Sequence, residues 1–245
     1  MRMHPSPNHD ARPPGRVVDM LVLHYTGLPS RAAALDRLCD PAARVSAHYL
    51  IDEDGAVTHL VTEDRRAWHA GEACWAGERD VNGCSLGIEL VNPGHDWGYQ
   101  PFPELQVAAL VALAGDIVAR HAIAPERVLG HADVAPARRK DPGELFDWAR
   151  LARSGIGLVV RASAWLSTEP PGREGGATGG HVTALQRRLA RFGYDVAATG
   201  SYDAQTAATV TAFQRHFRQA RVDGVADRET EAALEDLVAQ LGRAR

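Results

Sequence analysis

VVDMLVLHYT, residues 17–26, is a run of β-branched and apolar residues that predicts a largely buried β-strand. Downstream, SAHYLIDEDGAVTHLV (46–61) contains two strand-like runs around a central Asp-Gly pair, which is a strong signal for a hairpin. SLGIELVN (85–92) predicts a further buried strand, and helical patterns occupy 30–39 and 103–121. These elements predict an α/β (α+β) fold in which a mixed central β-sheet is flanked by helices.

The chain changes in composition on both sides of this region. Residues 1–16 are polar and rich in proline, which predicts a flexible arm before a main domain at 17–165. A Gly/Pro-rich linker is expected at 166–180, and three apolar helical stripes in 181–245 predict a small three-helix domain. Because the linker is long and rich in glycine, we expect the two domains to separate without exposing a large shared core.

Charge and hydropathy bear on which partners the protein binds and on where it is located. The 245 residues carry a formal net charge of -4, so no basic field is available to hold nucleic acid. The longest apolar stretch, roughly Val107 to Ala114, is too short for a transmembrane segment. The N-terminal sequence lacks a secretory signal, which favours a cytoplasmic protein and leaves a periplasmic or envelope location open. We expect a monomer.

The cysteines predict no disulfide framework. Cys39, Cys74 and Cys84 are odd in number and have no CxxC spacing, so buried free thiols are the simpler interpretation. A single bridge between Cys74 and Cys84 stays open for an exported protein.

Three residues suggest a metal site. His24 ends a hydrophobic strand, while His131 and Asp141 bracket a loop-rich segment, GHADVAPARRKDPG. Two neutral imidazoles, one carboxylate and a water form a common catalytic zinc set, and its chemistry suits amide hydrolysis. Spacing alone leaves open that His24 is a hydrogen-bonded core histidine and that Asp141 caps a loop.

Glu89 is an isolated acidic residue in an otherwise apolar strand. A buried carboxylate is costly unless it is paired or functional, and burial should raise its pKa. That would suit Glu89 to take a proton from a metal-activated water and pass it to a leaving amine. The alternative is a structural ion pair with an arginine.

An aromatic segment could line a substrate groove. Trp68 and His69 are consecutive, and Trp75 and Trp97 follow nearby. Their rings have apolar faces and polar edges, as contacts to sugars and peptides require.

Five motifs together carry a family resemblance. LVLHYTG, VSAHYLIDEDG, RAWHAG, NGCSLGIELVNPG and GHADVAPARRKDPG occur in the order seen in zinc N-acetylmuramoyl-L-alanine amidases, including the anhydromuropeptide-recycling enzymes. The resemblance covers about residues 17–153, and it extends more distantly to phage amidases and peptidoglycan-recognition proteins. The C-terminal helical sequence resembles the three-helix peptidoglycan-binding module of cell-wall hydrolases.

The resemblance implies roles for individual residues. It implies that His24, His131 and Asp141 bind Zn²⁺ and that Glu89 is the catalytic acid/base. It also implies substrate contacts, which we assign to Trp68, His69 and Asn92.

One position departs from the family pattern. The family usually has a lysine two residues before the aspartate ligand, where it stabilises the oxyanion. Here that position holds Arg139, and Lys140 follows it. Either side chain could serve, since both are positively charged, although they differ in length and donor geometry. We expect Arg139 to take this role, with Lys140 as the alternative.

The resemblance implies a zinc amidase that hydrolyses the bond between N-acetylmuramoyl, or anhydromuramoyl, and L-alanine in peptidoglycan or soluble muropeptides. The alternative is a non-catalytic peptidoglycan-recognition protein, since such relatives keep the fold and can lose the metal. The complete ligand set favours the enzyme. A zinc peptidase is a third possibility, but the chain has no HExxH helix.

Overall fold

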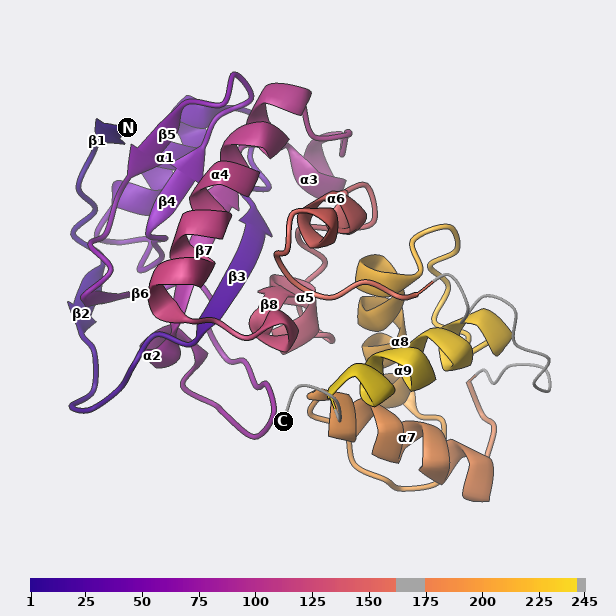
Figure 1. Ribbon diagram of the computed structural model, residues 1–245. Coiled ribbons are helices and arrows are strands. Elements are labelled where there is room, and N and C mark those ends of the chain that lie inside the picture. The colour runs from indigo at the N-terminus through magenta and orange to yellow at the C-terminus, as the bar shows by residue number, and fades with distance from the viewer. Residues whose placement is uncertain (162–174, 242–245) are drawn as a thin grey trace.

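The computed structural model describes residues 1–161 and 175–241 (Figure 1). A six-stranded sheet with the order β1-β5-β4-β7-β3-β8 forms its centre, and β2 pairs with β6 in a separate two-stranded sheet. The central sheet mixes parallel and antiparallel pairs, as the sequence predicted. The strands are β1 (Arg2–Met3), β2 (His9–Ala11), β3 (Met20–Tyr25), β4 (Tyr49–Ile51), β5 (Val57–His59), β6 (Arg65–Ala67), β7 (Ser85–Leu90) and β8 (Val128–Gly130).

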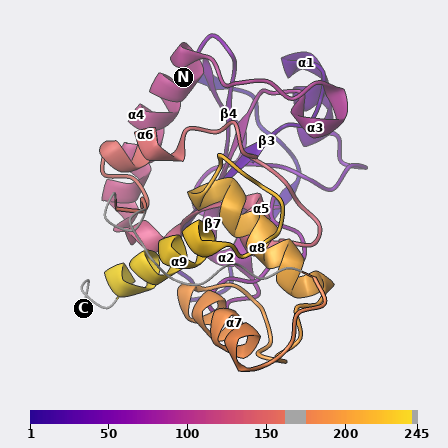
Figure 2. The same ribbon diagram turned by 90° about the vertical axis from the view of Figure 1, so that its right-hand side faces the viewer.

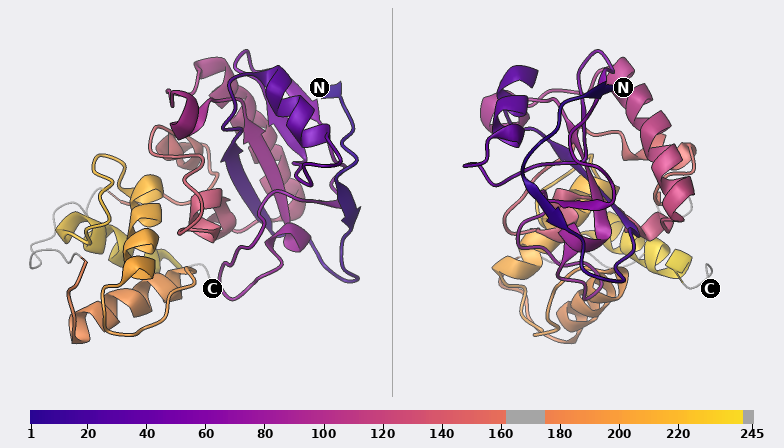
Figure 3. Two further views of the ribbon diagram at one scale, coloured as in Figure 1. Left: turned by 180° about the vertical axis from the view of Figure 1, so that it is seen from behind. Right: turned by 90° about the vertical axis from the view of Figure 1, so that its left-hand side faces the viewer.

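Helices cover both faces of the sheet. The long helix α4 (Glu104–His121) lies along one face, and α1 (Arg31–Cys39) lies across the opposite face (Figure 3). The remaining short helices are α2 (Val81–Cys84), α3 (Gly94–Trp97), η1 (Pro125–Arg127), α5 (His131–Val134) and α6 (Trp148–Arg153). The predicted C-terminal helical domain is present as α7 (Gly180–Phe192), α8 (Ala204–Phe217) and α9 (Arg228–Leu241).

Side chains alternate between the two faces along β3 and β7. Leu21 and Leu23 pack in the same apolar cluster as residues of α4. Leu86 and Ile88 of β7, which pair with them in the sheet, belong to that cluster too. The intervening residues face the other side, and the parallel register places His24 directly beside Glu89. The hydrophobic period of two therefore brings both sequence candidates to one face.

The N-terminal segment differs from the expected flexible arm at 1–16. β1 pairs in parallel with β5, and β2 pairs with β6. Ser6 and Asn8 are buried, with the Asn8 amide donating to the carbonyls of Asp40 and Val45 at 2.9 and 2.8 Å. Polar composition suggested mobility, but these side chains satisfy backbone groups that would otherwise be buried without partners.

Arg12 joins this segment to helix α2 and to the first residue of β7. Its guanidinium donates to the backbone carbonyls of Asn82, Gly83 and Ser85 at 3.2, 2.9 and 2.9 Å, and also to that of Glu63. Such multiple bonding uses the fork of donors that only arginine offers.

The two domains share a core, contrary to the expectation that they separate. Trp75, almost fully buried, packs edge-on against Phe192 and Tyr194, and one continuous apolar cluster contains Met20 and Val22 of β3 as well as residues from α7, α8 and α9. Helix α8 lies against α5 (Figure 2). The composition of the linker does not determine whether the two domains pack together. That depends on the side chains at their contact surface, such as Trp75, Phe192 and Tyr194.

Most of the expected linker at 166–180 lies outside the described residues. Its described end is already part of the helical domain, because Thr178 forms a β-bridge with Ser201 and α7 starts at Gly180.

Two smaller expectations concern the membrane and the cysteines. In the parts of the chain that the structure describes, none of the helices combines the length and apolarity needed to cross a bilayer. Cys39, Cys74 and Cys84 are free thiols, so no Cys74–Cys84 bridge forms, and Cys39 is only partly buried.

The shared core predicts that a change at Trp75 destabilises the whole chain. Trp75→Ala should lower the free energy of unfolding by about 3–5 kcal/mol, the usual range for removing a buried tryptophan. Urea denaturation followed by circular dichroism should still show one transition, moved to lower urea. Trp97→Ala is the matched control, because Trp97 is 62% exposed. Two separate transitions, of which only one moves, would show that the domains fold independently.

Candidate active site

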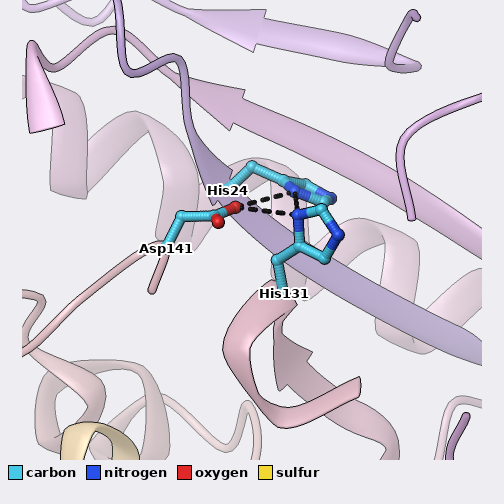
Figure 4. Close-up of side chains that lie close together, drawn as sticks. All are labelled: His24, His131 and Asp141. Atoms are coloured by element: carbon cyan, nitrogen blue, oxygen red, sulfur yellow. Dashed lines mark hydrogen bonds and ion pairs between the residues drawn. The ribbon is translucent and has the colours of Figure 1, made fainter. Parts of the chain in front are cut away.

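Three buried side chains converge on the face of the sheet opposite α4. His24 is the penultimate residue of β3, His131 is the first residue of α5 directly after β8, and Asp141 follows the loop beyond α5. The two Nδ1 atoms are 3.0 Å apart, and Asp141 Oδ2 lies 3.0 Å from His24 Nδ1 and 3.1 Å from His131 Nδ1 (Figure 4). Asp141 thus directs its carboxylate at both imidazoles, so the loop-capping alternative does not describe it.

The surroundings of His131 test whether this group suits a cation. Its Nε2 lies 3.0 Å from the backbone carbonyl of Ala70, which can only accept, so Nε2 carries the proton. When the ring is neutral, its Nδ1 therefore carries a lone pair that faces the Asp141 carboxylate, which is also an acceptor. Two acceptors at this distance repel each other unless a positive charge lies between them. The arrangement fits a metal ion, and these three residues form a group able to hold one.

The charge states agree with this interpretation. Burial, together with the neighbouring His131, lowers the pKa of His24 to about 4. Burial by itself would raise the pKa of Asp141, but contacts with His131 and His24 outweigh it and hold that pKa below its usual value. At neutral pH His24 is a neutral imidazole and Asp141 an anion, the states in which each binds a metal.

Glu89 lies beside His24 in the sheet and also lines the cleft. Burial raises the pKa of Glu89 well above its usual value; the negative charge of Asp141 adds to the rise and Arg139 opposes it. Its Oε2 is enclosed without a hydrogen-bond donor, and no ion pair joins Glu89 to any residue in the described ranges. The structural ion-pair alternative therefore lacks a partner among them.

A cleft of about 430 Å³ opens above these residues, bounded by α1 on one side and by the loop after α5 on the other. Trp68, Arg139 and Lys140, the sequence candidates for a groove and for an oxyanion contact, line it. The side chains of Arg139 and Lys140 are exposed, which leaves both cations free to reach a bound molecule. Arg138, which sequence reasoning did not single out, also lines the cleft and donates to the carbonyls of Ala70 and Glu72.

Of four further sequence candidates, one borders the cleft and three lie outside it. His69 borders the cleft, but both its ring nitrogens contact protein atoms, His24 Nε2 at 3.0 Å and Ser85 Oγ at 3.1 Å. Asn92 is buried away from the cleft lining, with its amide donating to Gln100 and accepting from Gly94. Trp75 belongs to the shared core, and Trp97 is exposed outside the cleft. A sequence pattern gives residue types but not the direction of these side chains.

A buried carboxylate that sequence reasoning missed holds the start of α5. Asp133 accepts hydrogen bonds from the Gly130 amide, the Tyr194 hydroxyl and His216 Nδ1, at 2.7, 2.6 and 2.7 Å. Tyr194 and His216 belong to the C-terminal domain, and His131 lies two residues before Asp133. The helical domain therefore supports the segment that carries a candidate metal ligand.

Comparisons with known proteins agree with this geometry. Residues 14–144 match the N-acetylmuramoyl-L-alanine amidase family, and residues 178–234 match a peptidoglycan binding domain family. The chain is 38% identical over 241 residues to the N-acetylmuramoyl-L-alanine amidase AmiD of Escherichia coli, covering 92% of this chain and 84% of AmiD.

A shorter relative and a solved structure add to this comparison. The 1,6-anhydro-N-acetylmuramyl-L-alanine amidase AmpD of Enterobacter cloacae is 36% identical over 163 residues, which is 60% of this chain and 85% of AmpD. Among solved structures, the complex of E. coli AmiD with anhydro-N-acetylmuramic acid-L-Ala-D-gamma-Glu-L-Lys superposes with a TM-score of 0.79 at 37% identity, covering 92% of this chain and 90% of that one.

The ligand geometry predicts one metal ion per chain. Added zinc should bind the full chain in a 1:1 ratio, and His131→Ala should reduce bound zinc to background because it removes one of three ligands. Elemental analysis after gel filtration measures the ratio. His181→Ala, which changes an exposed histidine of α7, is the control and should bind zinc normally. A His131→Ala protein that retains its zinc would place the metal elsewhere.

Proposed function

The chain belongs to the N-acetylmuramoyl-L-alanine amidase family, and we propose that His24, His131 and Asp141 hold a catalytic zinc ion beside Glu89. The protein is an amidase that hydrolyses the amide bond between a muramoyl group and L-alanine. The observation that supports the proposed site is the placement of Glu89, with its unpartnered Oε2, next to the two imidazoles and the carboxylate.

The donor set favours zinc over harder metals. Two imidazole nitrogens with one carboxylate oxygen suit Zn²⁺, whereas Mg²⁺ and Ca²⁺ prefer all-oxygen sites. A zinc ion held by His24, His131 and Asp141 would supply a Lewis acid able to polarise the substrate carbonyl and to lower the pKa of an attacking water to about 7.

Glu89 acts as the general base and then as the general acid. Burial raises its pKa, the direction that helps a carboxyl group to accept a proton from the attacking water and return it to the leaving amine. Oε2 has no competing donor among the described residues, so it is free to accept that proton.

Arg139 stabilises the oxyanion that develops on the substrate carbonyl. It lines the cleft and its charge acts on both Glu89 and His24, which places it within electrostatic reach of the reacting groups. Arg138, its neighbour, is committed to two backbone carbonyls and cannot take the same role without breaking them. Lys140 is the alternative cation.

We propose soluble anhydromuropeptides as the preferred substrate. AmiD, which covers nearly the same length, has been solved with such a compound, and AmpD is named for the same chemical class. The C-terminal domain matches a peptidoglycan binding family, which supports a contact with larger peptidoglycan as well. A non-catalytic recognition protein would need neither the ligand set nor an unpartnered Glu89.

The role of Glu89 is tested by its amide analogue. Glu89→Gln should keep its zinc and lower kcat by at least about 10²-fold, because the amide cannot carry the proton. The assay follows the release of free L-Ala-D-γ-Glu-L-Lys from anhydro-N-acetylmuramic acid-L-Ala-D-γ-Glu-L-Lys by mass spectrometry. Near-normal turnover by the variant would make Glu89 a structural residue, and no peptide release by the unchanged protein would refute the proposed substrate.

Two neighbouring cations provide a matched pair. Arg139→Ala should lower kcat by roughly 10²–10³-fold with little change in KM, because an oxyanion donor acts mainly in the transition state. Lys140→Ala should have a mild effect in the same steady-state assay. The reverse order would assign the oxyanion role to Lys140.

A further inference from the structure

We infer that the consecutive residues His69 and Ala70 act as a positioning unit that fixes which ring nitrogen of both histidine ligands faces the metal. His69 does so for His24 through its side chain, and Ala70 does so for His131 through its carbonyl. The inference rests on the proposed metal site. It gives His69 a positioning role in place of the substrate contact that the sequence suggested.

The first step is set by Ser85. Its hydroxyl donates its single proton to the carbonyl of Val81 at 2.5 Å. Toward His69 Nε2, at 3.1 Å, the same oxygen can therefore only accept, so the proton of the His69 ring lies on Nε2. His69 Nδ1 then carries a lone pair.

The second step passes this constraint to His24. His69 Nδ1 lies 3.0 Å from His24 Nε2 and, as an acceptor, requires a proton on that nitrogen. The lone pair of a neutral His24 consequently lies on Nδ1, which faces Asp141 and His131 Nδ1. Each hydrogen bond in the chain Val81–Ser85–His69–His24 has only one direction.

The backbone is built to hold His69 in place. The Asn82 side-chain oxygen accepts from the amides of both His69 and Ala70, at 3.1 and 2.9 Å. Gly87 leaves room for the ring, because a Cβ there would lie 2.5 Å from His69 Cγ. A single asparagine thus anchors the two groups that orient the two ligands.

Such outer contacts matter because a histidine ligand with the wrong proton position must rearrange before it can bind. Partners of this kind typically change metal affinity by about 10–100-fold when they are removed. A preset pair of lone pairs lets the metal bind without that rearrangement.

The unchanged full-length protein supplies the first test. Nitrogen-15 NMR of the histidine rings, on metal-free and zinc-loaded samples, reports which nitrogen is protonated. We expect His24 to carry its proton on Nε2 in both samples, and His69 likewise. A metal-free His24 protonated on Nδ1, or divided between the two forms, would overturn the inference.

Two nearly isosteric variants supply the second test. His69→Leu removes the acceptor and should weaken zinc binding by about 10–100-fold, whereas His69→Asn can place its side-chain oxygen where Nδ1 lies and should recover most of that loss. Competition with a chromophoric chelator measures both dissociation constants. Equal affinity of the two variants would mean that His69 acts by packing alone.

Ser85→Ala removes only one hydroxyl and tests whether Ser85 sets the direction of the hydrogen bonds from Ser85 through His69 to His24. It should let the His69 proton redistribute between its two nitrogens in the NMR spectrum, and an unchanged His69 spectrum would exclude Ser85 as its determinant.

These outcomes are separate from failure of the proposed function. A protein that binds no zinc refutes the metal site, whereas normal zinc binding with an unconstrained His24 refutes only the positioning unit.

Discussion

The parallel pairing of β3 with β7 is the constraint on which the site depends. Its register places His24 beside Glu89, and Met20 beside Ser85, on the same face of the sheet. Because side chains alternate strictly, Ser85 and Glu89 point away from α4, while Leu86 and Ile88 point toward it. A shift of one residue would exchange the two sets, burying Glu89 under α4 and exposing leucine and isoleucine to the cleft. The same apolar contacts that stabilise the sheet therefore hold the catalytic register.

A second dependence links helix α5, which carries His131, to the C-terminal domain. Asp133 is buried and receives two of its three hydrogen bonds from Tyr194 and His216. Burying a carboxylate is unfavourable unless such partners compensate for lost hydration. The helical domain supplies them, and it also completes the core around Trp75. In this chain the domain thus has a structural role beside any contact with peptidoglycan.

Much of the fold could be predicted because its signals are local. The apolar runs of β3 and β7 and the Asp-Gly hairpin between β4 and β5 each depend on neighbouring residues. The proposed ligands, two histidines and one aspartate, stand at strand and loop ends. β1 and β2 could not be predicted, since they have two and three residues and owe their pairing to distant partners. The same limit applies to His69 and Trp75. Their identity suggested a groove, but their orientation is fixed by Ser85 in one case and by the C-terminal domain in the other.

Arg12 shows that family resemblance and folding unit have different borders here. The family match runs from 14 to 144 and contains every proposed ligand as well as Glu89 and Arg139. Arg12, outside it, fastens the carbonyls of Asn82 and Ser85, the two residues that hold His69 and set its proton. A fragment limited to residues 14–144 would keep the proposed catalytic residues but lose the Arg12 contacts to Asn82 and Ser85. For this protein, residues 14–144 contain the proposed catalytic residues but not all of the contacts that hold them.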